Sequence, residues 1–246
     1  MASATNYFAP VDILDINTLL TLEGTAQWLI QSNNKTGSKT VAKGLNGTGD
    51  VSATKEHNAM ESRTLVYECQ AETGFLTLLK AGQVTSAGWH IDSVAVAYQN
   101  AGWPQMTVAC HKHAGAASHE TGDCRTYTCS LALPAQFGVP STVTDLTPVT
   151  PVAIFTLGSA AVALRSLSYT LGLTHVDEPG GAGDWHSGEN RAGVETLDAQ
   201  FLGNVDAADL TIGTGWHQPA DGDNTSNQGA GTSSLQIQHD LLKDAA

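Results

Sequence analysis

The sequence predicts a mainly β protein, built from antiparallel sandwich-like or barrel-like sheets with one short helix and long loops. Three observations lead to this fold class. Only 14% of the residues are charged and 6% are aromatic, whereas the chain holds 25 glycines, a composition that suits short strands joined by many turns. Several segments alternate apolar and polar residues with the period of two that a half-buried strand requires. Clusters of Gly, Pro and Asn separate those segments.

The N-terminal elements are less regular than the later ones. Residues 19–30 are compatible with a strand pair or a short helix. Residues 31–62 are polar, rich in Gly, Asn and Lys, and show little periodicity, so we expect a long loop or arm that orders against a partner. Residues 64–70 alternate like a strand. Residues 72–81 are the best candidate for the short helix, with Gly82 as its stop.

Two β-hairpins are predicted further along the chain. The first runs from Trp89 to His113, and a turn-like stretch separates its two alternating strands. Its apolar alternate positions are Val94, Val96 and Tyr98, followed by Met106, Val108 and Cys110. The second hairpin carries a Gly-rich acidic excursion, residues 175–193, between its strands. Its apolar alternate positions are Leu167, Tyr169, Leu171 and Leu173, followed by Leu197, Ala199 and Phe201.

Prolines divide the chain into two β-rich halves. We expect an N-terminal half at residues 1–133, which includes the polar loop, and an acidic C-terminal half at residues 152–246. Residues 134–151 are punctuated by proline and would form a linker or a crossover over the sheet. The two halves are also compatible with a single domain.

The charge balance excludes two classes of partner. The formal net charge is −13, and residues 166–242 contain eleven acids against the single base Arg191. A field of this sign repels phosphate backbones and anionic lipid headgroups, so specific nucleic-acid binding and membrane binding are not expected. The N-terminus lacks the basic region of a signal peptide. The apolar run at residues 149–164 is interrupted and shorter than the ~20 residues that span a bilayer.

One segment concentrates potential metal ligands. Its members are Cys110, His111, His113, His119, Cys124 and Cys129. The spacing between the three cysteines matches no standard zinc ribbon or finger, so we expect no stoichiometric metal and mostly reduced thiols.

The sequence also lacks the common catalytic motifs. It contains no nucleophile elbow, phosphate-binding loop, dinucleotide fingerprint or zincin motif. The excursion after the second hairpin strand does hold a mixture of residues able to bind a divalent cation or to supply paired carboxylates. These are His175, Asp177, Glu178, Asp184, His186 and Glu189. Because that excursion is rich in glycine, it does not offer the rigid support that catalysis needs. We expect no enzyme and no cofactor.

Three segments resemble the tail tube (major tail) proteins of tailed bacteriophages. They are HIDSVAVAYQNAGWPQMTVACHKH, LRSLSYTLGLTHVDE and NRAGVETLDAQFLG. The resemblance implies a virion protein, assembled in the host cytoplasm, whose β-sandwich subunits join into rings and stack along the tail. Its partners would be copies of itself and other tail proteins. The polar loop, through Asn33, Lys35, Lys39 and Lys43, would reach the next ring.

An acidic tube wall is physically suited to the transient passage of DNA, because it offers no phosphate-binding stripe. Glu195 and Asp198 are the carboxylates expected to face such a lumen. Two other classes fit the same composition: a capsid decoration or other virion surface protein, and a secreted carbohydrate-binding module or glycosidase. The latter would use its tryptophans to stack on sugars. The candidates are Trp89, Trp103, Trp185 and Trp216.

Overall fold

The computed structural model confirms a mainly β chain in which every strand pair is antiparallel, and the part it describes contains no helix. In that part there is accordingly no helix long and apolar enough to cross a membrane. The described residues are 28–69, 75–76, 80–85, 88–99, 103–113, 127, 133–134, 154–157, 163–179, 185–202, 210–219, 225–227 and 232–241.

The described residues form thirteen strands. They are β1 (Trp28–Leu45), β2 (Val51–Cys69), β3 (Phe75–Leu76), β4 (His90–Gln99), β5 (Gln105–His113), β6 (Leu133–Pro134), β7 (Phe155–Leu157), β8 (Ala163–Pro179), β9 (Trp185–Leu202), β10 (Leu210–Ile212), β11 (Trp216–His217), β12 (Thr225–Asn227) and β13 (Thr232–Leu241).

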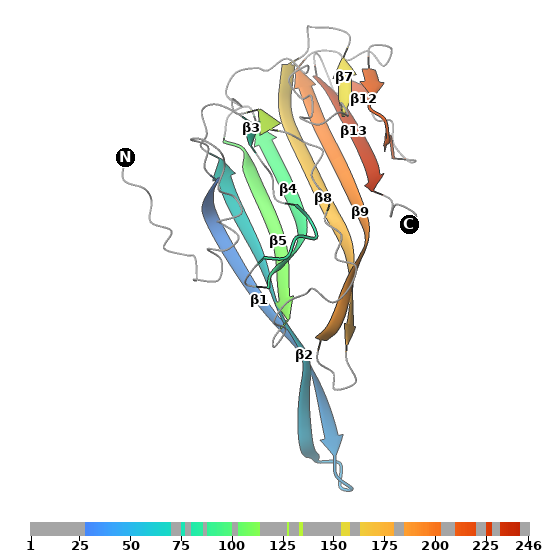
Figure 1. Cartoon of the computed structure of the whole chain (residues 1–246). Coiled ribbons are helices and arrows are strands. Elements are labelled where there is room, and N and C mark those ends of the chain that lie inside the picture. The colour runs from blue at the N-terminus through green and yellow to red at the C-terminus, as the bar shows by residue number, and fades with distance from the viewer. Residues whose placement is uncertain are drawn as a thin grey trace, which may run out of the picture.

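Nine of these strands form one open sheet in the order β1-β2-β5-β4-β8-β9-β13-β11, with β12 paired to β13 (Figure 1). The N-terminal and C-terminal halves meet at β4 and β8, whose pairs run from Gln99↔Ser166 to Ser93↔Gly172. The two halves of the sequence therefore share a single sheet. Two small sheets, β10-β7 and β3-β6, complete the described strands.

Both predicted hairpins are present, as β4-β5 and β8-β9. Their alternate apolar residues are buried, except for the partly buried Leu173, and form the core together with residues of β2 and β13. The largest buried side chains on these strands include Tyr67, Met106, Tyr169 and Phe201. Burying an apolar side chain of this size contributes about 1.5–3 kcal/mol relative to leaving it exposed. The core is therefore a continuous layer along one sheet.

The helix predicted at residues 72–81 is wrong where the structure describes it. Phe75 and Leu76 form the short strand β3, which pairs with β6, and Ala81 makes an isolated β-bridge to Tyr127. A ten-residue helix is marginal on its own. Pairing with a distant segment therefore overrides the local helical pattern.

The long loop predicted at residues 31–62 is also wrong, because these residues belong to the β1-β2 hairpin. The Asn46 side-chain oxygen organises its turn by accepting hydrogen bonds from the backbone N–H groups of Thr48 (3.0 Å) and Asp50 (2.8 Å). Gly49 adopts the left-handed region there, with φ of 87°. The segment looked like a loop because a ribbon with polar residues on both faces has no apolar alternation.

The described parts of the Gly-rich excursion predicted at residues 175–193, namely residues 175–179 and 185–193, are strand as well. β8 extends to Pro179 and β9 begins at Trp185, and their pairing continues from Pro179↔Trp185 through His175↔Asn190. Of the predicted crossover at residues 134–151, only Pro134 lies among the described residues.

Candidate functional site

Four strands bring polar side chains into one row near the end of the sheet. His111 on β5 pairs with His90 on β4, and His175 on β8 pairs with Asn190 on β9. The last β4-β8 pair is Ser93↔Gly172. Continuing that register by three residues brings His90 opposite His175. We call the row of His90, His111, His113, His175, Asp92, Asp177 and Asn190 the histidine cluster.

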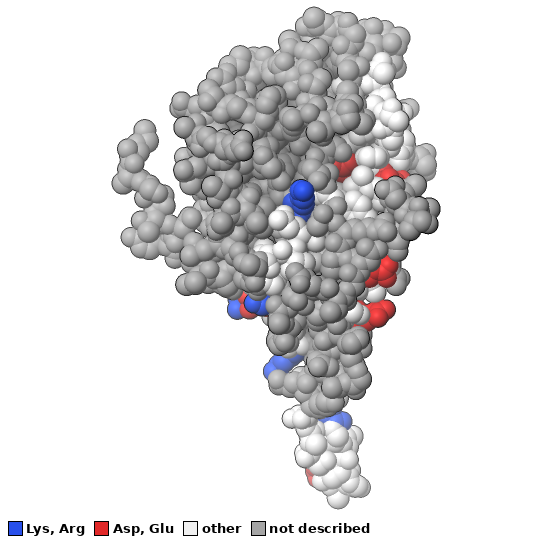
Figure 2. All heavy atoms as spheres, viewed as in Figure 1, with Lys and Arg blue, Asp and Glu red and all other residues white. Residues whose placement is uncertain are grey.

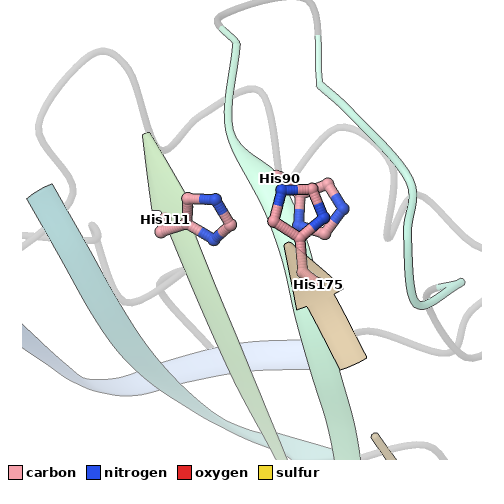
Figure 3. A group of neighbouring side chains, drawn as sticks. All are labelled: His90, His111 and His175. Atoms are coloured by element: carbon pink, nitrogen blue, oxygen red, sulfur yellow. The ribbon is translucent and has the colours of Figure 1, made fainter. Parts of the chain in front are cut away.

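The imidazole rings of the histidine cluster are in contact range. The ring centroids of His90 and His175 lie 4.1 Å apart, and the ring centroid of His111 lies 5.0 Å from that of His90 and 5.1 Å from that of His175. Figure 3 shows these three rings converging from β4, β5 and β8. A fourth ring, that of His113, has its centroid 5.4 Å from that of His111.

Two carboxylates and one amide connect the rings. Asp92 Oδ1 lies 2.9 Å from His90 Nδ1 and 2.7 Å from His111 Nδ1. Asp177 uses one oxygen for His175 Nε2 and the other for His113 Nε2, both at 3.0 Å. The Asn190 side-chain oxygen lies 2.6 Å from His175 Nδ1 and 3.0 Å from His90 Nε2.

The connections change the acidity of the cluster. Burial alone would raise the pKa of Asp92, but hydrogen bonds from His111 and His90 outweigh it and lower that pKa. Burial would also raise the pKa of Asp177, but hydrogen bonds from His113 and His175 hold that pKa far below its usual range. Burial would lower the pKa of His175, but Asp177 and Asn190 raise it. Both carboxylates are therefore anionic at neutral pH, and they favour positive charge between them.

The cluster is closely packed and mostly buried, with Asp92, His175 and Asp177 partly exposed. His90, His111, His113 and Asn190 are buried. Gly188 on β9 is required at its position, because a Cβ there would lie 2.7 Å from His175 Nε2. Buried polar groups are costly unless they are partnered. This cluster can hold protons, or a cation with affinity for nitrogen, between its carboxylates.

The cluster unites parts of two candidate groups that are far apart in the sequence. His111 and His113 come from the cysteine-rich segment, and His175 and Asp177 come from the acidic excursion. Cys110 is a buried thiol of the apolar core. The other candidates stand apart from the cluster or are not described. The side chain of Glu178 is exposed. The candidates whose side chains the structure does not describe are His119, Cys124, Cys129, Asp184 and His186.

Sequence reasoning missed His90, Asp92 and Asn190. A usable signal was present, since the chain contains His90-x-Asp92, His111-x-His113 and His175-x-Asp177. In a strand, residues two apart point to the same face. Two of these pairs lie on predicted strands, and the third follows directly after one, so together they mark a shared polar patch.

The predicted lumen residues differ in their environments. Glu195 is buried, with 0% of its surface exposed; its carboxylate accepts a hydrogen bond from the Tyr169 hydroxyl and lies 2.8 Å from His239 Nδ1. The expectation that Glu195 faces solvent is wrong, because it has the same strand parity as the buried Leu197. Asp198 lies on the exposed positions of β9, where partial burial raises its pKa against the effect of a Gln236 hydrogen bond.

The predicted assembly residues fall in two places on β1. Asn33 and Lys35 pair with Leu65 and Arg63 of β2, within the main sheet. Lys39 and Lys43 lie further out, because the β2-β5 pairing ends at Met60↔His113. We call residues 39–59, which continue as a two-stranded ribbon past that pair, the arm. Figure 1 shows the arm projecting beyond the other strands. With ~3.4 Å per residue, its reach is about 30 Å.

The arm carries exposed apolar side chains. Val41, Leu45 and Val51 are 41%, 64% and 52% exposed, and Leu45 pairs directly with Val51 next to the turn. Among the described residues, the remaining large exposed apolar side chain is Trp103. Of the tryptophans considered for sugar stacking, Trp89 and Trp216 are buried and Trp103 is exposed, and the side chain of Trp185 lies outside the described ones.

No protein-family model matches this sequence, and no curated protein matches it significantly. The arm and the histidine cluster are therefore interpreted from their own geometry.

Proposed function

We propose that this protein is a structural subunit that assembles with copies of itself through the arm, and that the assembly is the tail tube of a tailed bacteriophage. The observation that carries the first part is the apolar tip of the arm. The second part rests on the resemblance of the two hairpins to tail tube proteins. No catalytic role is proposed.

The arm needs a partner for physical reasons. A two-stranded ribbon is marginally stable at best in water unless a third strand or another surface covers it. The described part of the arm exposes three large aliphatic side chains near a tip that otherwise carries polar residues. Covering these side chains in an assembly removes apolar surface from water, at about 25 cal/mol per Å².

The acidic flank of a second copy is the partner that charge favours. The arm carries Lys39, Lys43 and Lys55 against Asp50 and Glu56. The C-terminal strands are acidic, and the exposed carboxylates described there are those of Glu178, Asp198 and Asp240. In the face shown in Figure 2, most of the visible basic side chains lie on the arm and at its base, and most of the visible acidic ones lie on the side of the C-terminal strands. Complementary potentials of this kind steer association and fix its register.

The open sheet adds a second reason for assembly. β1 is an edge strand in the described sheet, and long open edges pair readily with other chains. Ring closure removes such edges and produces a closed symmetric oligomer. A tube of these subunits would present mainly negative charge to passing DNA, which disfavours phosphate binding.

The test replaces the apolar tip by Val41→Ser, Leu45→Ser and Val51→Ser together. We expect sedimentation and negative-stain electron microscopy to show rings or tubes for the wild type and monomers for the triple variant, with the melting temperature of the monomer changed little. Trp103→Ser removes an exposed apolar side chain outside the arm and should assemble normally. A wild type that stays monomeric at high concentration would refute self-assembly. Closed particles without tubes would leave self-assembly standing and refute only the proposal that the assembly is a tail tube.

A further inference from the structure

We propose that His90, His111 and His175 form a binding site for one divalent transition-metal ion of the zinc class, with Asp177 as the fourth ligand. This inference is independent of the proposed assembly. The spacing within residues 110–129 predicts no metal site. The site proposed here instead draws its ligands from three strands that meet only in the folded sheet.

The ring spacing agrees with a tetrahedral ion. A Zn–N bond of about 2.1 Å places the centre of a coordinated imidazole about 3.2 Å from the ion, so two such rings in a tetrahedral site lie about 5.2 Å apart. The observed centroid separations of 5.0 and 5.1 Å from His111 match this value. The His90–His175 separation of 4.1 Å requires these two rings to open by about 1 Å.

The nitrogen atoms of these rings are arranged as in metal sites. In such sites a ligating histidine usually donates its other N–H to a carboxylate or carbonyl oxygen, which fixes the tautomer. Asp92 lies within hydrogen-bonding distance of the Nδ1 atoms of both His90 and His111, and the Asn190 oxygen does the same for His175. With Nδ1 held by an oxygen on all three rings, an ion would bind through Nε2. The Nε2 atoms of His90 and His175 lie 3.0 Å from oxygens of Asn190 and Asp177, and an ion bound there would replace these two contacts.

Asp177 is placed to complete the set of ligands. Its carboxylate lies 3.0 Å from His175 Nε2, and it can share a metal ion with His111 and His113. His113 contacts the second oxygen of the same carboxylate and would orient it. Together Asp92 and Asp177 supply two negative charges, which balance a divalent ion in this buried site. Imidazole and carboxylate donors suit zinc better than calcium or magnesium, which prefer oxygen alone.

The main experiment is titration of untagged, metal-free wild-type protein with Zn²⁺, followed by calorimetry and elemental analysis. We expect one ion per chain with a dissociation constant below about 1 µM, and a rise in melting temperature with excess Zn²⁺ because the ion binds the folded chain. Co²⁺ at the same site should give the visible absorption of a four-coordinate centre. A wild type that takes up no Zn²⁺ at 100-fold excess would overturn the proposal.

Variants then locate the ion. His175→Gln removes a ligand and should weaken Zn²⁺ binding at least tenfold. Asp92→Asn changes a positioning residue and should weaken it about 10- to 100-fold. His217→Gln is the matched control, because His217 lies half-exposed outside the cluster, and it should bind like the wild type. Equal affinity of His175→Gln and the control would place the ion elsewhere and refute the site. If a variant does not fold, the wild-type stoichiometry and Co²⁺ spectrum still decide.

Discussion

Arg63 and Glu195 illustrate how single charged residues are accommodated in this sheet. Arg63 is 5% exposed; its guanidinium lies 4.9 Å from the ring centre of Trp89, and its Nε donates to Glu61 at 2.8 Å. Glu195 contacts Tyr169 and His239. A buried charge is tolerated only when hydrogen bonds and opposite charge compensate for lost hydration. Glu195 therefore depends on partners from β8 and β13, whereas Arg63 depends on Glu61 of its own strand and on Trp89, which precedes β4.

The Glu61 carboxylate gives a pH-dependent prediction. Burial would raise its pKa, but hydrogen bonds from Lys35 and Arg63 outweigh it and lower the pKa. A lowered folded-state pKa stabilises the protein above the unfolded value of about 4.3, and this contribution is lost as pH falls through the folded value. Glu61→Gln should therefore lower the free energy of unfolding by about 1–3 kcal/mol at pH 7, and the difference should shrink below about pH 4.3.

Urea unfolding at pH 7 and at pH 3 measures this difference. Glu178→Gln, which removes an exposed carboxylate, is the control and should change stability by less than about 0.5 kcal/mol at pH 7. A Glu61→Gln effect of equal size at both pH values would show that charge is not its cause.

At the scale of elements, the arm is distinguished from the other hairpins by what covers it. β4-β5 and β8-β9 have neighbouring strands and contribute buried side chains to the core. Beyond the Met60↔His113 pair, the strands of the arm pair only with each other among the described residues. Local opening costs little free energy where few apolar contacts are buried. A change in the turn of the arm should therefore alter how often the arm opens, without altering the opening of the main sheet.

Gly49→Ala tests that independence. Gly49 has φ of 87°, and no atom lies within 4 Å of a Cβ built there, so the substitution costs backbone strain alone. A left-handed conformation costs an L-residue about 1–2 kcal/mol. In the unassembled chain, amide hydrogen exchange should accelerate about 5- to 30-fold in the arm and stay unchanged in β4 and β5. Gly47→Ala, equally open but without the positive φ, is the control. Acceleration throughout the sheet would contradict a separately opening arm.

At the scale of the whole molecule, charge is distributed unevenly. The chain carries a net charge of −13, yet its projecting arm holds several lysines. Such asymmetry favours head-to-tail contact between copies, because the arm of one copy and the acidic flank of the next attract each other. Attraction between exposed charges is screened by salt over about 10 Å at 0.1 M.

A charge exchange tests this contact. Lys39→Glu with Lys43→Glu should prevent assembly by making the arm repel the acidic flank. Asp198→Lys with Asp240→Lys should also prevent it within one population, because two basic surfaces then meet. Mixing the two double variants should restore co-assembly, measured by light scattering and electron microscopy. If the mixture of the two double variants assembles no better than either variant alone, the arm does not contact these carboxylates.

The sequence by itself determined the strands whose two faces differ. Val94, Tyr98, Met106 and Leu167 alternate with polar residues, and that period specifies both a strand and its buried face. The same period puts Glu195 on the buried face with Leu197, but we expected it to face a lumen because of its charge, and the structure shows it buried. Charge was thus the weaker guide, since partners on other strands can compensate a buried carboxylate.

Only the tertiary structure decided the arm, the β3-β6 pair and the histidine cluster. The arm is mostly polar and its few apolar residues do not alternate regularly, so its sequence shows no strand period, and β3 depends on a strand far along the chain. The cluster joins His90, His111 and His175 through the pairing of β4 with β5 and with β8. Strand order and register arise from contacts between distant segments. Local sequence patterns therefore pointed to only part of the site, and the sheet brings those residues together with His90, Asp92 and Asn190.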